Sequence, residues 1–368
     1  MKDGTKKKKK IPRLLGTVFL LAMAVLAVTL AVRSQQEGGI RALWREMFGD
    51  PGTDEFFFES ASGGQVADMD MGLAVAAGSG LYVYDKEGEL TFSRLYSYQD
   101  PAMAAEGDYG AVWNVGGDKV IFFTKKGIIK ELSFENPVIS ASVNDLGYLA
   151  VCTEESGYYG SVTVYNYEAT AIYRWYAGSG RVLSAKVGGR DRLLVVTVGI
   201  GGSGIKLMGL DSETTAAEYT YEGLIIDAAF TDAGFVAVTD NKLIGLDGEL
   251  KVDWEYGFTD RYLTHCAIRP GAIALGLSDY LVGGHKRIVT LSAEGVETAV
   301  MELTGEITDM SLMYDKVAVL TGGEAILYDR ELNEKGRYEC DPGAEHIVIR
   351  DDSTVLCAGT FSAYVYGK

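Results

Sequence analysis

The chain opens with two contrasting stretches, which are followed by a long series of short alternating segments. Six lysines and Arg13 lie within residues 1–13, and residues 14–32 carry no charged side chain. A helix needs about 20 apolar residues to cross a bilayer. From residue 68 onward, short β-branched and aromatic runs alternate with turns rich in Gly, Asp and Asn. The pattern predicts one transmembrane helix over 14–32 and an all-β domain over 54–368.

The basic residues before the span predict its orientation, because Lys and Arg are retained on the cytoplasmic side. We expect residues 1–13 to form a cytoplasmic tail and the β domain to lie outside the cell membrane. The alternative is a cleaved signal peptide, whose apolar core is usually shorter, about 7–15 residues. A juxtamembrane linker over 33–53 is predicted to hold a short amphipathic helix, with Ile40, Leu43, Trp44, Met47 and Phe48 on its apolar face.

The β region repeats one unit eight times. The units begin near residues 68, 101, 138, 181, 224, 262, 307 and 344. This spacing is typical of four-stranded propeller blades. The eighth unit has three strands, and we expect a strand over 56–60 to supply the fourth and to close the ring. The sequence therefore predicts an eight-bladed β-propeller, with seven blades as the alternative if the first two units are parsed wrongly.

The turn after the third strand of each unit carries its own signal. The clearest copies cover residues 81–97, 162–178, 243–257 and 325–339, each with an Asp or Asn at the turn. Such a side chain accepts a hydrogen bond from the backbone two residues further on. We therefore expect tight hairpins that the Asp or Asn side chain holds.

The most distinctive segment is GYYGSVTVYN, Gly157–Asn166, which YRWYAG follows. With the lysine-rich tail, the single span and the repeats, it resembles a bacterial family of membrane-anchored, PQQ-like β-propellers known only as a domain of unknown function. The resemblance covers most of the chain. It implies a location in the cell envelope and a propeller, and it implies no established activity.

Charge separates the tail from the rest of the chain. Of the 34 basic and 51 acidic residues, seven and one fall within residues 1–32, so the remainder carries a net charge of −23. Proteins bind nucleic acid largely through Lys and Arg on phosphates. We therefore expect no nucleic-acid partner, and we expect the acidity to keep an exported domain soluble.

The candidate chemistry is sparse. Quinone-dependent dehydrogenases share the propeller fold but use adjacent cysteines and a calcium-binding set, whereas Cys152, Cys266, Cys340 and Cys357 are all separate. Cys340 and Cys357, from neighbouring blades, are the one pair to examine for a disulfide. The histidines have no metal-ligand spacing. We predict no cofactor, no metal, no catalytic residue and no enzymatic activity.

Three long connections between second and third strands are expected to share one face of the propeller: 154–161, 199–204 and 278–286. Loops on a rigid scaffold commonly bind partners, and aromatic residues are enriched at binding hot spots. The candidate binding residues are Tyr158, Tyr159, Tyr280, Glu154 and Glu155.

These features predict an anchored interaction or scaffold domain that binds an envelope protein or polymer. One alternative is an envelope polysaccharide hydrolase or lyase with two carboxylates converging at the channel mouth. Another is a sensor domain that signals inward through a partner of the short tail.

Overall fold

The computed structural model describes residues 55–58, 64–212, 214–280, 286–313 and 315–367. The predicted tail, transmembrane helix and linker lie outside these residues. Within the described ranges, no helix has the length and apolar character needed to cross a membrane.

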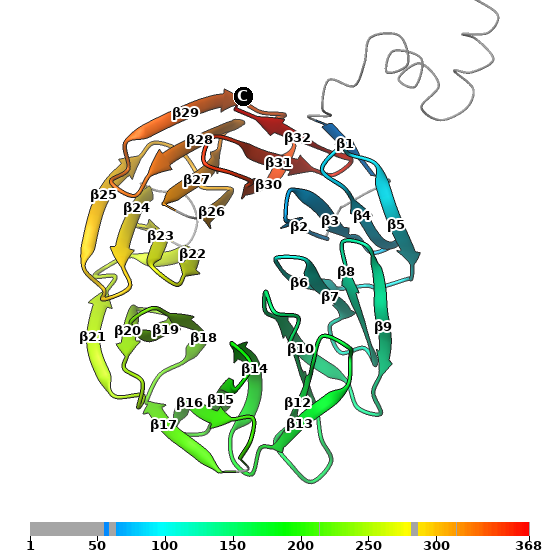
Figure 1. Cartoon of the computed structure of the whole chain (residues 1–368). Helices are drawn as coiled ribbons and strands as arrows, with labels where there is room; N and C mark the ends of the chain where they lie inside the picture. Colours follow the sequence, from blue (N-terminus) through cyan, green and yellow to red (C-terminus); the bar gives the residue numbers. More distant parts are fainter. Residues whose placement is uncertain (1–54, 59–63, 213, 281–285, 314, 368) are drawn as a thin grey trace, which may run out of the picture. The chain divides into compact units, whose positions relative to one another are not determined.

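Eight four-stranded antiparallel sheets follow one another around a ring (Figure 1). The eight-bladed architecture that the repeats predict is confirmed. The first strand of every blade begins within three residues of the predicted start of a unit.

Blades 1 to 4 take their strands in chain order, from the innermost to the outermost. Blade 1 holds β2 to β5, and blades 2, 3 and 4 hold β6 to β9, β10 to β13 and β14 to β17. Their bounds are β2 Gln65–Met69, β3 Gly72–Ala76, β4 Gly80–Tyr84, β5 Leu90–Leu95, β6 Pro101–Glu106, β7 Tyr109–Asn114, β8 Lys119–Thr124, β9 Gly127–Ser133, β10 Val138–Val143, β11 Leu149–Thr153, β12 Ser161–Tyr165, β13 Ala171–Tyr176, β14 Arg181–Gly188, β15 Arg192–Gly199, β16 Gly202–Gly209 and β17 Thr215–Tyr221.

Blades 5 to 7 repeat the arrangement, and blade 8 combines both ends of the β domain. Blades 5, 6 and 7 hold β18 to β21, β22 to β25 and β26 to β29, while blade 8 holds β30, β31, β32 and β1. Their bounds are β18 Ile225–Thr231, β19 Gly234–Thr239, β20 Lys242–Leu246, β21 Val252–Gly257, β22 Tyr262–Arg269, β23 Ala272–Ser278, β24 Lys286–Ser292, β25 Glu297–Leu303, β26 Asp309–Met313, β27 Lys316–Thr321, β28 Glu324–Asp329, β29 Glu334–Glu339, β30 Ala344–Ile349, β31 Val355–Gly359, β32 Ser362–Tyr366 and β1 Glu55–Phe57.

The strand that completes blade 8 comes from before blade 1. β1 pairs antiparallel with β32, and Phe56 lies opposite Ala363. Phe56 is fully buried, whereas its neighbour Phe57 is 47% exposed. The closing strand was expected over 56–60; the structure gives it as Glu55–Phe57, and residues 59 and 60 lie outside the described ranges. Pairing the two ends removes an open sheet edge, which a linear array of blades would leave exposed.

The hydrophobic core is divided among the interfaces between blades. The described residues form eight buried clusters, and each cluster combines residues of two consecutive blades. At the closure, Phe56 and Leu356 of blade 8 pack with Leu73 of blade 1. A single four-stranded sheet has two apolar faces, so each blade must be covered on both sides by its neighbours.

Polar side chains of the innermost strands also join successive blades. The hydroxyls of Ser140 and Ser142 in β10 donate to the carbonyls of Leu183 and Ala185 in β14, at 2.9 and 2.6 Å. These bonds satisfy backbone groups that face the central channel, where no fifth strand exists to pair with them.

The predicted hairpin turns are confirmed in detail. The Oδ1 atoms of Asp85, Asn166 and Asp247 each accept bonds from the N–H groups two and four residues on. The residue three positions after the Asp or Asn has a positive φ; it is Gly88, Ala169 or Leu250 in these turns. Ala169 and Leu250 are buried in the interfaces between blades, and this burial offsets their backbone strain.

Candidate functional site

The loop of residues 154–160, between β11 and β12, is the best-formed candidate for binding. Its backbone is fastened to two other segments: the N–H of Tyr159 donates to the carbonyl of Ala177 at 2.9 Å, and the N–H of Val182 donates to the carbonyl of Tyr159 at 3.0 Å. Gly160 has a φ of 119°, and a Cβ there would meet Val182 at 3.1 Å. The loop is therefore held against the start of blade 4.

The aromatic side chains of this loop remain exposed. Tyr158 and Tyr159 are 53% and 58% exposed, and Tyr176 at the end of β13 is 39% exposed. The rings of Tyr158 and Tyr176 lie 4.9 Å apart between centroids. The guanidinium of Arg174 lies 5.0 Å from the ring of Tyr176. We call Tyr158, Tyr159 and Tyr176 the blade 3 aromatic patch.

Tyr176 was not among the sequence candidates. It belongs to an outer strand with many aromatic residues, AIYRWY, whose side chains alternate between exposed and half-buried. The alternation indicates which side chains face outward, but it does not show that one of them reaches the loop of residues 154–160.

The two predicted glutamates are engaged in ion pairs. Glu154 pairs with Arg181, and a carboxylate oxygen of Glu155 lies 3.1 Å from Nη2 of Arg174. The same oxygen of Glu155 accepts a 3.4 Å bond from the Ser161 hydroxyl. The glutamates thus orient the arginines beside the aromatic patch, which leaves the tyrosines as its contact surface.

Two hollows adjoin the patch and share Glu155. A hollow of about 270 Å³ is lined by Ile139, Tyr158, Tyr159, Arg181 and both glutamates. A groove of about 640 Å³ runs beside the outer strands, with Phe134 from blade 2 and Tyr165, Tyr173, Arg174 and Tyr176 from blade 3 among its lining residues. Burial raises the pKa of Tyr165 in this groove, so its hydroxyl stays protonated at neutral pH.

Tyr280 is the fifth predicted binding residue, and it lies in another sector of the ring. It is 65% exposed and follows β23 in blade 6. Connections between second and third strands open on one face because successive strands alternate in direction. The strands of blade 6, however, lie across the ring from those of blade 3 (Figure 1). The structure therefore does not bring Tyr280 together with Tyr158 and Tyr159.

The glycine-rich stretch 199–204 was wrongly expected to form a long loop. Strand β15 continues to Gly199 and β16 begins at Gly202, so the ladder pairs these two glycines and leaves a tight turn. The backbone φ of 132° at Gly202 explains the glycine, since an added Cβ would lie 2.0 Å from the carbonyl oxygen of Tyr221.

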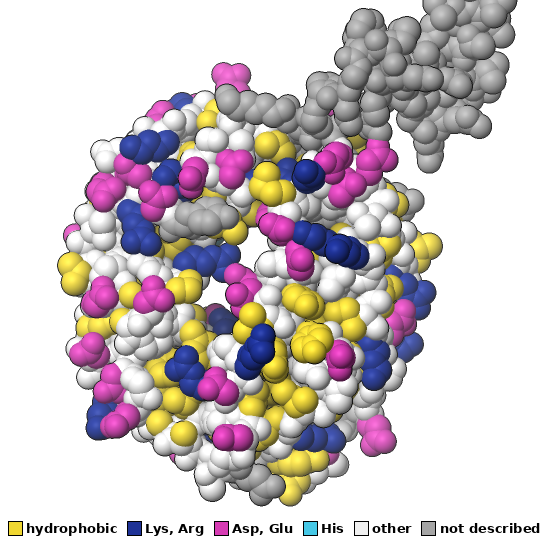
Figure 2. All heavy atoms as spheres, viewed as in Figure 1, with side chains coloured by type: hydrophobic (Ala, Val, Ile, Leu, Met, Phe, Trp, Pro, Cys, Tyr) yellow, Lys and Arg dark blue, Asp and Glu magenta, His cyan; other side chains and the backbone are white. Residues whose placement is uncertain are grey.

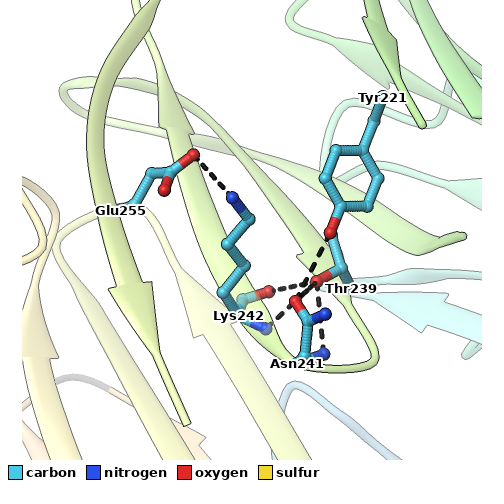
Figure 3. A network of polar contacts seen from close by, with 5 residues as sticks. All are labelled: Tyr221, Thr239, Asn241, Lys242 and Glu255. Carbon is cyan, nitrogen blue, oxygen red and sulfur yellow. Dashed lines mark hydrogen bonds and ion pairs between the residues drawn. The ribbon is translucent and has the colours of Figure 1, made fainter. Parts of the chain in front are cut away.

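The equivalent turn of blade 5 shows how the other connections differ from the loop of residues 154–160. There the hydroxyl of Thr239 donates to the carbonyl of Lys242 at 2.8 Å, and the Lys242 ammonium lies 2.7 Å from Glu255 (Figure 3). The Tyr221 hydroxyl donates to Asn241 at 3.4 Å. The polar side chains of this turn are thus paired with one another, with Tyr221 of blade 4 and with Glu255 of β21.

Charged side chains gather around the central opening of the ring (Figure 2). A cavity of about 510 Å³ is lined by Asp68, Asp70, Glu106, Arg269 and Arg350 among others. Each of these acids has a basic partner. Asp68 lies 3.4 Å from Arg350, Asp70 lies 2.6 Å from Lys125, and Glu106 lies 3.3 Å from Arg269. Burial raises the pKa of Asp68 to about 6, although the charge of Arg350 opposes this shift.

In the described part of the chain, no group of three His, Cys, Asp or Glu side chains is placed to hold a metal ion. His265 contacts the carbonyl of Thr308 at 3.3 Å, and His346 lies 3.8 Å from Asp309. His285 lies outside the described ranges.

Comparison with known proteins supports the fold and leaves the activity open. The model of a family of unknown function, DUF5711, matches residues 54–198. Among curated proteins, none matches the sequence.

Several solved structures share the propeller at low sequence identity. BamB from Moraxella catarrhalis is 12% identical with a TM-score of 0.58, covering 85% of this chain and 98% of its own. Apo AztD from Citrobacter koseri is 10% identical with a TM-score of 0.53, covering 83% and 90%. Hsv2 from Kluyveromyces lactis is 8% identical with a TM-score of 0.52, covering 75% and 98%. The chain thus carries an eight-bladed, BamB-like propeller whose residues 54–198 match the DUF5711 family of unknown function.

Proposed function

We propose that the chain is a membrane-anchored binding module of the cell envelope, and that its blade 3 aromatic patch contacts a protein partner. The observation that supports this most is the exposure of Tyr158 and Tyr159 on a loop whose backbone is held in place. Tyr and Arg are enriched among the residues that dominate binding energy. A held loop also loses little conformational entropy when a partner binds.

The location rests on the sequence. The uncharged stretch 14–32 behind a lysine-rich tail favours an anchor with the propeller on the outer side. In this proposal the module has no catalytic activity and needs no cofactor.

Photo-crosslinking of the full-length chain in its own membrane tests the proposal. A photoreactive residue at the exposed position of Ser156, in the same loop, should capture a partner. The double change Tyr158→Ala, Tyr159→Ala should reduce the captured amount at least about tenfold, since hot-spot truncations cost about 1–2 kcal/mol or more. The matched control is Tyr167→Ala. Tyr167 is 51% exposed in the same blade, but it lies in the β12–β13 turn on the opposite face.

Equal capture by the double variant and by Tyr167→Ala would contradict the proposal. Digesting the captured material with protease or with glycan hydrolases distinguishes a protein from an envelope polymer. Loss of the adduct only after glycan digestion would favour the polymer.

The second candidate function is an envelope polysaccharide hydrolase or lyase. It is favoured by acidic side chains at the channel mouth. Asp70 and Asp108 converge on the ammonium of Lys125, at 2.6 and 2.7 Å. The two carboxylates raise the pKa of Lys125, so its ammonium keeps its proton. Two carboxylates that converge on one point are the arrangement that glycoside hydrolysis uses. The test is whether the protein releases reducing ends from cell-wall polysaccharide. If Asp70→Asn abolishes this release and leaves binding unchanged, the alternative is favoured.

A further inference from the structure

Two buried thiols meet at the joint between the last two blades. Cys340 follows β29 in blade 7, and Cys357 lies in β31 of blade 8. Their sulfurs are 3.3 Å apart, and both residues are free thiols in the structure. Cys340 and Cys357 are 9% and 2% exposed.

We propose that Cys340 and Cys357 form a disulfide when the propeller meets a small disulfide oxidant, and that this bond locks blade 7 to blade 8. A disulfide requires an S–S distance of about 2.05 Å, so the sulfurs must approach by a little over 1 Å. Disulfides persist in oxidising compartments. The inference stands on this geometry and does not depend on the proposed binding role.

The surroundings of the pair support a stepwise exchange. When Cys340 ionises, the thiol of Cys357 donates a hydrogen bond to it, and this bond lowers the pKa of Cys340. A cavity of about 200 Å³ lined by Asp341, Cys357 and Tyr366 lies beside the pair and has room for a small reagent.

The exchange balances without any further reactant. The Cys340 thiolate attacks one sulfur of the oxidant, and the first thiol leaves. The Cys357 sulfur then attacks Sγ of Cys340 as it loses its proton, and the second thiol leaves. The two protein thiols are oxidised by two electrons, and the oxidant is reduced to two thiols that take up both protons.

The position of Cys357 gives the bond a structural consequence. Cys357 lies opposite Tyr364 of β32, and Tyr364 lies opposite Glu55 of β1. The disulfide therefore links blade 7 to Cys357, which is connected through Tyr364 of β32 to Glu55 of the closing strand β1. In the described residues, β1 is held by its pairing with β32 and by the packing of Phe56, and the disulfide would add a covalent link next to it.

Peptide mapping tests the link directly. The full-length chain in detergent is exposed to 2-hydroxyethyl disulfide, which is small enough to enter the cavity, and is then denatured, alkylated and digested with trypsin. Cleavage after Arg337 and Arg350 places the two cysteines in separate peptides, 338–350 and 351–368. We expect these two peptides to be joined to each other, while neither Cys152 nor Cys266 is joined to another cysteine.

Thermal unfolding tests the consequence. The oxidised form should melt about 5 °C above the reduced form, because the bond closes the segment 340–357 in the unfolded chain. Cys340→Ser and Cys357→Ser should abolish the difference, and Cys266→Ser should retain it. Cys266 is an exposed thiol and so controls for nonspecific oxidation.

Separate alkylation of Cys340 and Cys357 in a folded, oxidant-treated protein would overturn the proposal. A stable mixed disulfide between the reagent and either residue would overturn it as well. A joined peptide pair with no change in melting temperature would overturn the locking role.

Discussion

The guanidinium Nε of Arg350 lies 3.4 Å from Oδ1 of Asp68, so a buried ion pair joins the last blade of the ring to the first. Asp68 is in β2, and Arg350 follows β30. The guanidinium of Arg350 also lies 5.4 Å from the ring of Phe56 in the closing strand. Three segments that are remote in sequence therefore meet at one joint, where an unpaired charge would be costly.

Replacing Asp68 by Asn should change how stability depends on pH. The pKa of Asp68 is raised from 3.8 to about 6 in the folded protein, mainly by burial. Between these values the folded protein binds more protons than the unfolded chain, so the free energy of unfolding falls as pH rises. Between pH 5 and pH 7, the free energy of unfolding of the wild type should fall by about 1 kcal/mol more than that of Asp68→Asn.

Urea unfolding at the two pH values measures this difference. The control is Asp352→Asn, an exposed change in the turn after β30 that should keep the wild-type dependence. Identical pH dependence in wild type and Asp68→Asn would show that Asp68 has an ordinary pKa.

The closing strand should depend on Phe56 far more than on its neighbour. Phe56 is fully buried and meets Tyr84 edge-on at 6.2 Å between centroids. Phe56→Ala should lower the free energy of unfolding by about 3–5 kcal/mol. Phe57→Ala, at a residue 47% exposed in the same strand, should cost less than about 1 kcal/mol. Similar losses in the two variants would mean that β1 does not close the ring as described.

The ion pair between Glu106 and Arg269 joins blades 2 and 6, on opposite sides of the channel, at 3.3 Å. Both side chains are more than 40% exposed, so a double-mutant cycle should give a coupling below about 1 kcal/mol that falls further in high salt. Arg269→Gln should cost more than Glu106→Gln, because Arg269 also donates to the carbonyl of Leu312 at 3.1 Å. A large coupling that salt leaves unchanged would contradict this account.

Gly295 should tolerate no side chain. It has a φ of 74°, and a Cβ would lie 2.3 Å from the Trp254 ring of the preceding blade. Because an alanine would be strained at this positive φ and would overpack against Trp254, Gly295→Ala should lower the free energy of unfolding by about 2–4 kcal/mol. Gly248→Ala lies in the corresponding turn of blade 5 with nothing within 4 Å of the added Cβ, and it should change stability by less than about 0.5 kcal/mol. Equal effects on chemical denaturation would refute the steric argument.

Local patterns in the sequence predicted eight repeated units, with seven as the alternative, as well as the starts of their first strands and the hairpin turns held by Asp or Asn. Each of these features depends on a few adjacent residues. A two-residue alternation of apolar and polar side chains predicts a strand, and Asp85 or Asn166 accepts hydrogen bonds from the backbone of its own turn. The exposure of Tyr158 and Tyr159 was likewise predictable from their place in a loop.

Contacts between side chains that are distant in sequence follow from the packing of the blades around the ring. The curvature of the ring places Arg350 beside Asp68 and sets Tyr280 apart from the blade 3 aromatic patch. The sequence named Cys340 and Cys357 as the pair to examine, and the packing of blades 7 and 8 brings their sulfurs to 3.3 Å. The structure also shows that Gly199 and Gly202, which were expected in a long loop, pair with each other at the ends of β15 and β16. Such relationships depend on how whole sheets pack around an axis, and no local pattern of residues encodes that geometry.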